Sequence, residues 1–156
     1  MRYVYINYEG GVSVVIPAPG SSFDQVQSAL PKDRPWSEVP VEQVPSDRTY
    51  RNAWVFDHDA KAFSHDMPKA REIHKGFMRT ARTPLLAALD VAYIKADEKG
   101  PSGAAEKAQI AAEKAQIAAK KAVLRDCTKL PAIDAAATID DLRAVWIPEL
   151  GPNPNL

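Results

Sequence analysis

The sequence predicts an α+β protein, because its two halves follow different structural rules. The chain has 156 residues, of which 46% are hydrophobic and 26% charged, a composition that is typical of a globular domain and excludes collagen-like and disordered classes. Only 4 of the 25 alanines fall in residues 1–60, whereas 6 of the 13 prolines fall in residues 1–45. We therefore expect N-terminal β-hairpin structure, a proline-rich connector, a long α-helical hairpin and a short C-terminal helix.

Two β-hairpins are predicted in the first part of the chain. Residues 2–8 and 12–16 are rich in β-branched and aromatic side chains, which favour strands. The glycine pair at residues 10–11 supplies the positive φ that a tight turn needs. Residues 53–56 and 62–66 have a similar composition around a turn-like segment, and they predict a second, shorter hairpin.

The segment between the hairpins is predicted to be mostly irregular. Ser22 and Gln25 stand at the spacing of a capping box, so a short helix is expected over residues 23–30. Prolines then follow at positions 31, 35, 40 and 45. They recur too often for a helix or a central strand. We expect an extended connector that lies over a surface through Trp36.

A long helix is predicted over residues 69–99. Asp66 is a suitable N-cap, and Pro68 lies in the first turn, where a missing N–H costs little. Pro84 is expected to kink the helix or to split it after Arg82, because the proline ring displaces the carbonyl group four residues earlier.

An internal repeat follows the Gly-Pro-Ser-Gly segment at 100–103. Three seven-residue units occupy residues 104–110, 111–117 and 118–124. At 100° per residue, one seam of this predicted helix carries alanines 104, 108, 111, 115, 118 and 122, broadened by 105, 112 and 119. A separate ridge carries Ile110, Ile117 and Leu124.

Two arrangements of this helix remain open from the sequence. In the first, the alanine seam packs on residues 69–99 and the Ile ridge is covered by the β portion of the same chain. In the second, the Ile ridge is covered by another subunit. The ridge and two tryptophans are the candidate partner interface: Ile110, Ile117, Leu124, Trp36 and Trp146.

The last part of the chain predicts one short helix. Thr138 is its N-cap, with acidic residues in the first turn, and Pro148 ends it. The segment after Gly151 is predicted to have nothing to fold against. The resulting regions are residues 1–66, β-rich with the connector; 67–130, the helical hairpin; and 131–156, the short helix and tail.

Charge is segregated along a chain whose 20 basic and 20 acidic residues balance. Residues 67–130 hold 13 basic and 7 acidic groups, and both flanking regions are net negative. A basic stripe on one helix face carries Arg71, Lys75, Arg79 and Arg82. It is interpreted as a solvated polar face, with contact to DNA phosphates or to an acidic protein as the alternative.

No catalytic or metal-binding motif is recognised. Two His-Asp pairs and Asp57 could meet across the second hairpin and offer metal ligands, but ordinary turn and strand-end roles explain them equally: His58 with Asp59, and His65 with Asp66. His74 is predicted to be a packed core residue, and Cys127, the only cysteine, a buried or indifferent thiol. We expect no catalytic residue, no metal, no cofactor and no enzymatic activity.

Four segments resemble a family of small proteins that tailed-bacteriophage and prophage genomes encode. They read Asp47-Arg-Thr-Tyr-Arg-Asn-Ala-Trp54, Asp66-Met-Pro-Lys-Ala-Arg-Glu-Ile-His74, Thr83-Pro-Leu-Leu-Ala-Ala-Leu-Asp90 and Lys121-Ala-Val-Leu-Arg-Asp126. The first two are the more specific, although a turn anchored by buried Tyr50 and Trp54 also accounts for the first. The resemblance implies a virion-associated or tail-region protein, and it brings no catalytic residues.

Function is therefore expected to rest on protein contacts. The favoured expectation is a structural or accessory component of a phage tail or neck, present in multiple copies among other phage structural proteins. The alternatives are a tail or tail-fibre assembly chaperone and a packaged, ejected protein that contacts DNA. We expect location in the virion tail region, with the host cytoplasm during assembly, and no membrane-spanning segment or export signal.

Overall fold

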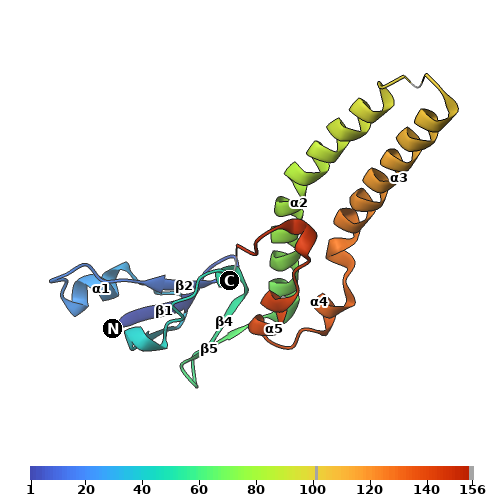
Figure 1. Ribbon diagram of the computed structural model, residues 1–156. Coiled ribbons are helices and arrows are strands. Elements are labelled where there is room, and N and C mark those ends of the chain that lie inside the picture. Colours follow the sequence, from blue (N-terminus) through green and yellow to red (C-terminus); the bar gives the residue numbers. More distant parts are fainter. Residues whose placement is uncertain (101, 155–156) are drawn as a thin grey trace. The chain divides into compact units, whose positions relative to one another are not determined.

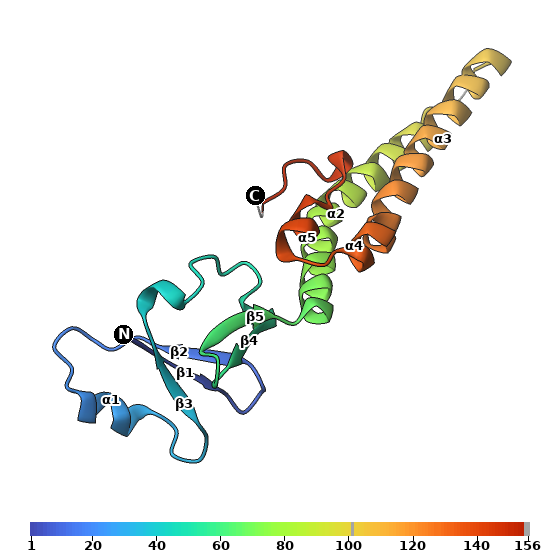
Figure 2. The same cartoon turned by 90° about the horizontal axis from the view of Figure 1, so that it is seen from below.

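The computed structural model describes residues 1–100 and 102–154, which form two compact units, residues 1–73 and 74–156 (Figure 1). The N-terminal unit contains an antiparallel sheet of three strands: β1 (Arg2–Ile6), β2 (Val12–Val15) and β3 (Trp36–Val39). β1 lies between the other two strands (Figure 2). The predicted α+β class is confirmed.

The first turn is fixed by the side chain of Asn7. Its Oδ1 accepts hydrogen bonds from the backbone N–H groups of Glu9 (3.0 Å) and Gly11 (2.9 Å). Gly10 has a φ of 76°, in the left-handed region that glycine adopts without steric cost. The register pairs Ile6 with Val12, so the predicted first hairpin is confirmed.

The third strand lies within the segment that the sequence predicts as an extended connector, where no strand was expected. β3 occupies the four residues between Pro35 and Pro40 and pairs with β1 only. An edge strand needs ladder donors on one side alone, so flanking prolines are tolerated there. The predicted short helix is confirmed as α1 (Phe23–Ala29), with both bonds of the Ser22–Gln25 capping box, and a 3₁₀ turn, η1, follows β3 at Val41–Gln43.

The second hairpin closes the core of this unit. It consists of β4 (Trp54–Asp57) and β5 (Ala62–His65), and a 3₁₀ turn, η2 (Arg51–Ala53), precedes it. The buried cluster contains Val4, Val12, Val39, Trp54 and Phe56. Tyr50 and Trp54 are 1% and 3% exposed, so both are the buried anchors that the sequence predicts.

The long helix α2 (Met67–Asp97) begins as predicted, because Asp66 Oδ1 accepts the N–H of Lys69 at 3.1 Å. Of the two predicted effects of Pro84, a kink or a split after Arg82, the split does not occur, because the helix continues through Pro84. Pro84 and Thr80, whose carbonyl loses its partner, are both exposed, so water can satisfy that carbonyl.

The C-terminal unit pairs α2 with α3 (Ala104–Asp126), and the two run antiparallel (Figure 1). The short elements that follow are η3 (Cys127–Lys129), α4 (Pro131–Ala135), α5 (Ile139–Ala144) and η4 (Pro148–Leu150). α5 is the predicted last helix, with a capping box at Thr138 and Asp141. α4 is an additional helix that the sequence prediction missed. The fully buried side chains of this unit include His74, Met78, Cys127, Ile133 and Leu142.

Candidate interaction surfaces

The contact between α2 and α3 is flanked by charged side chains of opposite sign. Three lysine–carboxylate ion pairs cross between the helices: Lys99 with Glu113 (2.7 Å), Lys114 with Asp97 (2.5 Å) and Lys121 with Asp90 (2.7 Å). The ring of Tyr93 lies between two of these lysines, with its centroid 4.8 Å from Lys114 Nζ and 5.0 Å from Lys121 Nζ. The face of α3 that carries residues 114, 117 and 121 is therefore the face that meets α2.

The Ile ridge belongs to this intrachain contact. Ile117 and Leu124 are buried within the chain and Ile110 is half-buried. Arg82 Nη1 donates to the backbone carbonyls of Leu124 (3.3 Å) and Arg125 (2.7 Å), which holds this end of the ridge against α2. The C-terminal unit itself therefore buries Ile117 and Leu124, and a role of this ridge in binding a partner stays a prediction.

The alanine seam is exposed, which overturns the predicted contact of the seam with residues 69–99. All nine seam and flanking alanines are exposed. The physical reason is area: isoleucine and leucine bury far more apolar surface than alanine, so the larger side chains occupy the contact.

We define the outer face of α3 as the twelve exposed positions that point away from α2. They are the nine alanines at 104, 105, 108, 111, 112, 115, 118, 119 and 122, with Gln109, Gln116 and Val123. None of these twelve positions is charged, and the exposed charged residues of α3, which include Glu106, Lys107 and Lys120, lie outside this face. A surface helix normally places its charges opposite the buried stripe. In the sequence, Glu and Lys occupy only the third and fourth positions of each seven-residue unit. This pattern indicates an uncharged exposed face, which the sequence prediction did not identify.

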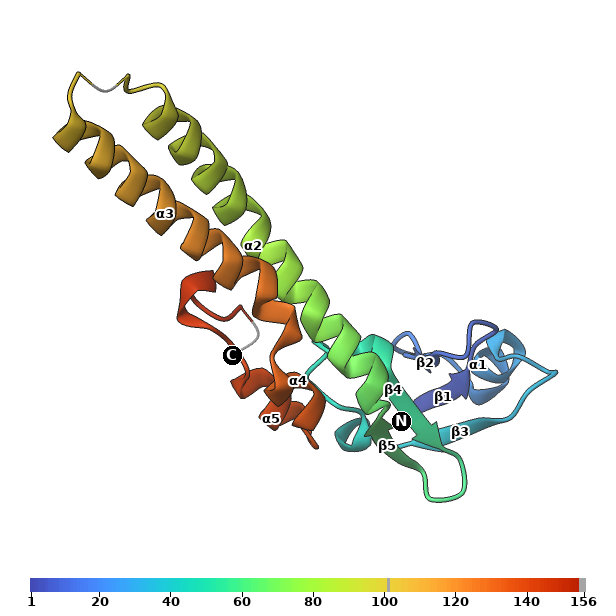
Figure 3. The same cartoon turned by 90° about the vertical axis from the view of Figure 1, so that its right-hand side faces the viewer.

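The far half of the helical hairpin has little apolar core. Between residues 84 and 123, Ala96 and Ile117 are the only buried residues among those described. Of the short C-terminal elements, η4 lies against this half, where Glu149 lines a hollow with Leu85, Leu89 and Lys120 (Figure 3). Val91 and Ile94 of α2 are 51% and 55% exposed and lie near one another on the helix surface. The hairpin thus presents apolar residues on α2 as well as on α3.

The basic stripe is largely engaged within the chain. Lys75 pairs with Asp134 at 3.4 Å, and Arg82 donates to the two carbonyls of α3. Arg71 and Arg79 also have interactions with other residues of the chain. The stripe therefore stabilises the fold. Fewer of its charges are available to bind a partner than on a fully solvated face.

The two candidate tryptophans both lie in local clusters. The half-buried ring of Trp36 makes edge contacts with Tyr3 and Phe23, at centroid distances of 5.8 and 6.5 Å. Phe23 is 51% exposed, so this aromatic cluster reaches the surface of the N-terminal unit. Trp146 donates from Nε1 to the carbonyl of Gly151 at 2.9 Å.

The segment after Gly151 is also tied to the chain. Asn153 Nδ2 donates to the carbonyl of Arg143 at 3.0 Å. The prediction that this segment has nothing to fold against is therefore wrong for the described residues, which end at 154. This segment is held by hydrogen bonding to the end of α5 rather than by apolar burial. Amino-acid composition alone does not reveal such hydrogen bonds.

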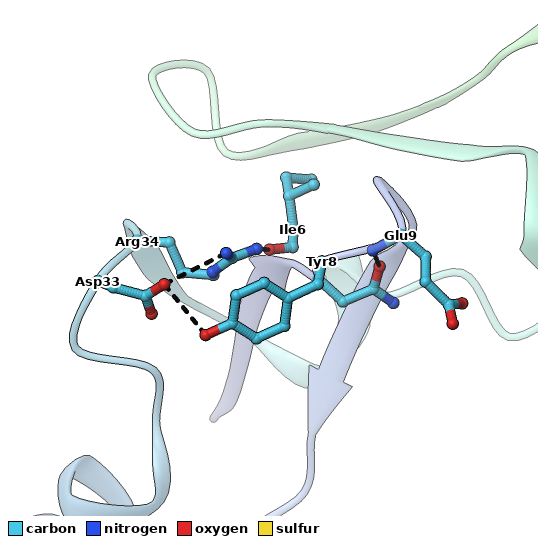
Figure 4. A network of polar contacts seen from close by, with 6 residues as sticks. Ile6, Tyr8, Glu9, Asp33 and Arg34 are labelled. Carbon is cyan, nitrogen blue, oxygen red and sulfur yellow. Dashed lines mark hydrogen bonds and ion pairs between the residues drawn. The ribbon is translucent and has the colours of Figure 1, made fainter.

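A polar network holds the loop before β3 against the end of β1 (Figure 4). The guanidinium carbon of Arg34 lies 3.7 Å from the ring centroid of Tyr8, and its Nη1 donates to the carbonyl of Ile6 at 2.9 Å. Asp33 accepts from Arg34 (3.3 Å) and from the Tyr8 hydroxyl (3.0 Å). These bonds lower the pKa of Asp33.

The suggested metal ligands do not come together. His65 pairs with Trp54 in the β4–β5 register, at the opposite end of the hairpin from the turn that carries His58. The carboxylate of Asp57 accepts two backbone N–H groups of that turn, from Asp59 and Ala60. The described residues hold no group of three potential metal ligands.

His74 and Cys127 occupy the positions that the sequence predicts. His74 is fully buried, and its Nε2–H donates to the carbonyl of Val145 at 2.8 Å. Burial lowers its pKa. Cys127 is 1% exposed. Neither side chain is open to a substrate.

Comparisons with protein-family models, curated proteins and solved structures found no match to this chain. Among the described residues, no helix is both long and apolar enough to cross a membrane.

Proposed function

We propose that this chain is a non-enzymatic structural or accessory component of a tailed-bacteriophage particle, located in the tail or neck, that acts through protein–protein contacts. The resemblance of four sequence segments to small phage and prophage proteins supplies the biological setting. The helical hairpin supplies the contact surface.

The outer face of α3 is the observation that carries this proposal. Twelve exposed positions without a charge are costly to maintain on a helix that remains in water, because charged side chains keep surfaces soluble and separate. Alanines at a 4-3-4-3-4 spacing allow another helix to approach closely over the full length of the repeat. A helical neighbour therefore suits this face.

The exposed Val91 and Ile94 support a repeated assembly. They lie on α2, whereas the outer face belongs to α3, so one hairpin can contact two neighbours. Contacts through two different surfaces generate rings or filaments rather than closed pairs. This is the geometry required of a protein present in multiple copies in a tubular structure.

The experiment that tests the proposal is quantitative mass spectrometry of purified particles of the phage or prophage that encodes the chain. A fixed number of copies per particle is the expected result. Presence in the infected-cell lysate with absence from mature particles would instead support a tail or tail-fibre assembly chaperone.

A further inference from the structure

The two segments that carry most of the family resemblance meet in the N-terminal unit. The backbone N–H of Asp66, which begins the second segment, donates to the carbonyl of Ala53 in the first at 2.8 Å. The first segment alternates in burial: Tyr50, Ala53 and Trp54 are buried, whereas Arg51 and Asn52 are exposed. The buried residues anchor the turn, and Arg51 and Asn52 are thereby held at the surface.

A hollow of about 340 Å³ lies at this junction. Its lining includes Asn7, Glu9, Ser13, Arg51, Asn52 and Lys69. A second hollow, of about 410 Å³, adjoins it and shares Asn52 and Lys69. We call the two hollows together the motif groove.

The first hollow is rich in hydrogen-bond donors. The Arg51 guanidinium forms no hydrogen bond or ion pair with any described residue. Ser13 Oγ accepts from Asn7 Nδ2 at 3.3 Å, which leaves its hydroxyl proton to donate. The Lys69 ammonium group has only a long contact of 3.7 Å with Asp66. Two cations face one carboxylate, Glu9, so this end of the groove favours an anionic group.

The second hollow differs in chemistry. Pro68 and Ile73 supply apolar surface, and Glu72, which also lines the hollow, already interacts with another residue of the chain. The groove therefore joins a cationic, donor-rich end to an apolar end through Asn52, whose amide can pair with a peptide backbone group.

We propose that the motif groove binds an extended peptide segment of a partner protein, in which a Glu or Asp side chain stands next to a bulky apolar residue. The carboxylate binds Arg51 and Lys69, and the apolar side chain lies on Pro68 and Ile73. This site is on the N-terminal unit, separate from the outer face of α3. It goes beyond the proposed function, because it names the chemistry of a second partner contact that needs no phage particle to be tested.

The test is an NMR titration of the full chain with the dipeptide acetyl-Glu-Leu-amide. We expect amide shifts at Ser13, Asn52 and Ile73, and at least fivefold weaker binding of acetyl-Gln-Leu-amide and of acetyl-Glu-Gly-amide. Arg51→Ala should weaken binding at least fivefold, whereas Arg48→Ala, an exposed arginine outside the groove, should not. A probe with a free terminal carboxylate, acetyl-Leu, distinguishes a chain end from a side chain and should bind more weakly. No shifts in the groove, equal binding of the Gln probe, or tighter binding of acetyl-Leu would overturn the proposal.

Discussion

The ammonium group of Lys121 lies 2.7 Å from a carboxylate oxygen of Asp90, and the side chain of Lys121 is only 13% exposed. A lysine at the boundary of a helix contact covers apolar surface with its methylene groups while its charge remains paired. Together with Lys114 and Glu113, it fixes the rotation of α3 about its own axis. That rotation directs Ile117 toward α2 and leaves the alanines outside.

The rotation of α3 predicts unequal effects of substitutions at two neighbouring positions. Ile117→Ala removes a buried side chain from the contact between α2 and α3, and should lower the free energy of unfolding by about 2–4 kcal/mol. Ala115→Leu, at an exposed position, should change it by less than about 0.5 kcal/mol. Chemical denaturation of both variants measures the difference, and a larger loss for Ala115→Leu would contradict the assigned rotation.

The buried His74 predicts a loss of stability in weak acid. Burial lowers its pKa below the ordinary value of 6.5. Just below pH 6.5, His74 is therefore protonated in the unfolded chain but remains neutral in the folded chain. The contribution is fully present above pH 6.5 and is lost as the pH falls toward the lowered pKa. The free energy of unfolding should therefore decrease between pH 7 and pH 5.

The matched comparison for this effect is His74→Gln, which keeps a donor for the Val145 carbonyl but does not titrate. Burial also lowers the pKa of His65, but both proteins contain His65, so its effect cancels in the difference between them. Denaturation curves across the pH range should show a smaller slope for the variant. An unchanged slope would show that His74 does not carry the dependence.

The engaged basic stripe predicts little affinity for nucleic acid. Lys75 and Arg82 are already bonded within the C-terminal unit, so few charges remain to neutralise phosphates. We expect a gel-shift titration with duplex DNA at about 0.15 M salt to show no binding in the micromolar range. Submicromolar binding that falls steeply with salt would favour the DNA-contacting alternative instead.

Most elements of the fold could be predicted because their signals are local. The Ser22 and Thr138 capping boxes, the Asn7–Gly11 turn and the Asp66 cap each depend on residues a few positions apart. β3 could not be predicted in this way, since it depends on pairing with β1 more than 30 residues earlier. Prolines on both sides concealed it.

The candidate surfaces were harder to predict, for a physical reason. Periodicity correctly separated the alanine seam from the Ile ridge, but it does not state which of two apolar stripes meets the neighbouring helix. The position of the charges decides: Lys114, Lys121 and Glu113 flank the ridge and pair with α2. The exposure of Arg51 and Asn52 likewise depends on which neighbouring residues of the segment are buried in the core. The sequence pattern alone does not determine this.

The measurement that tests the central claim most directly is the copy number of α3 variants in purified particles. Ala115→Glu places a charge in the middle of the outer face of α3, and Ala132→Glu places the same charge at an exposed position of α4 as the control. Thermal melting should show both variants folded. Quantitative mass spectrometry should find the wild type and Ala132→Glu at the same copy number and Ala115→Glu depleted at least tenfold. Equal incorporation of Ala115→Glu would contradict a role for this face in assembly.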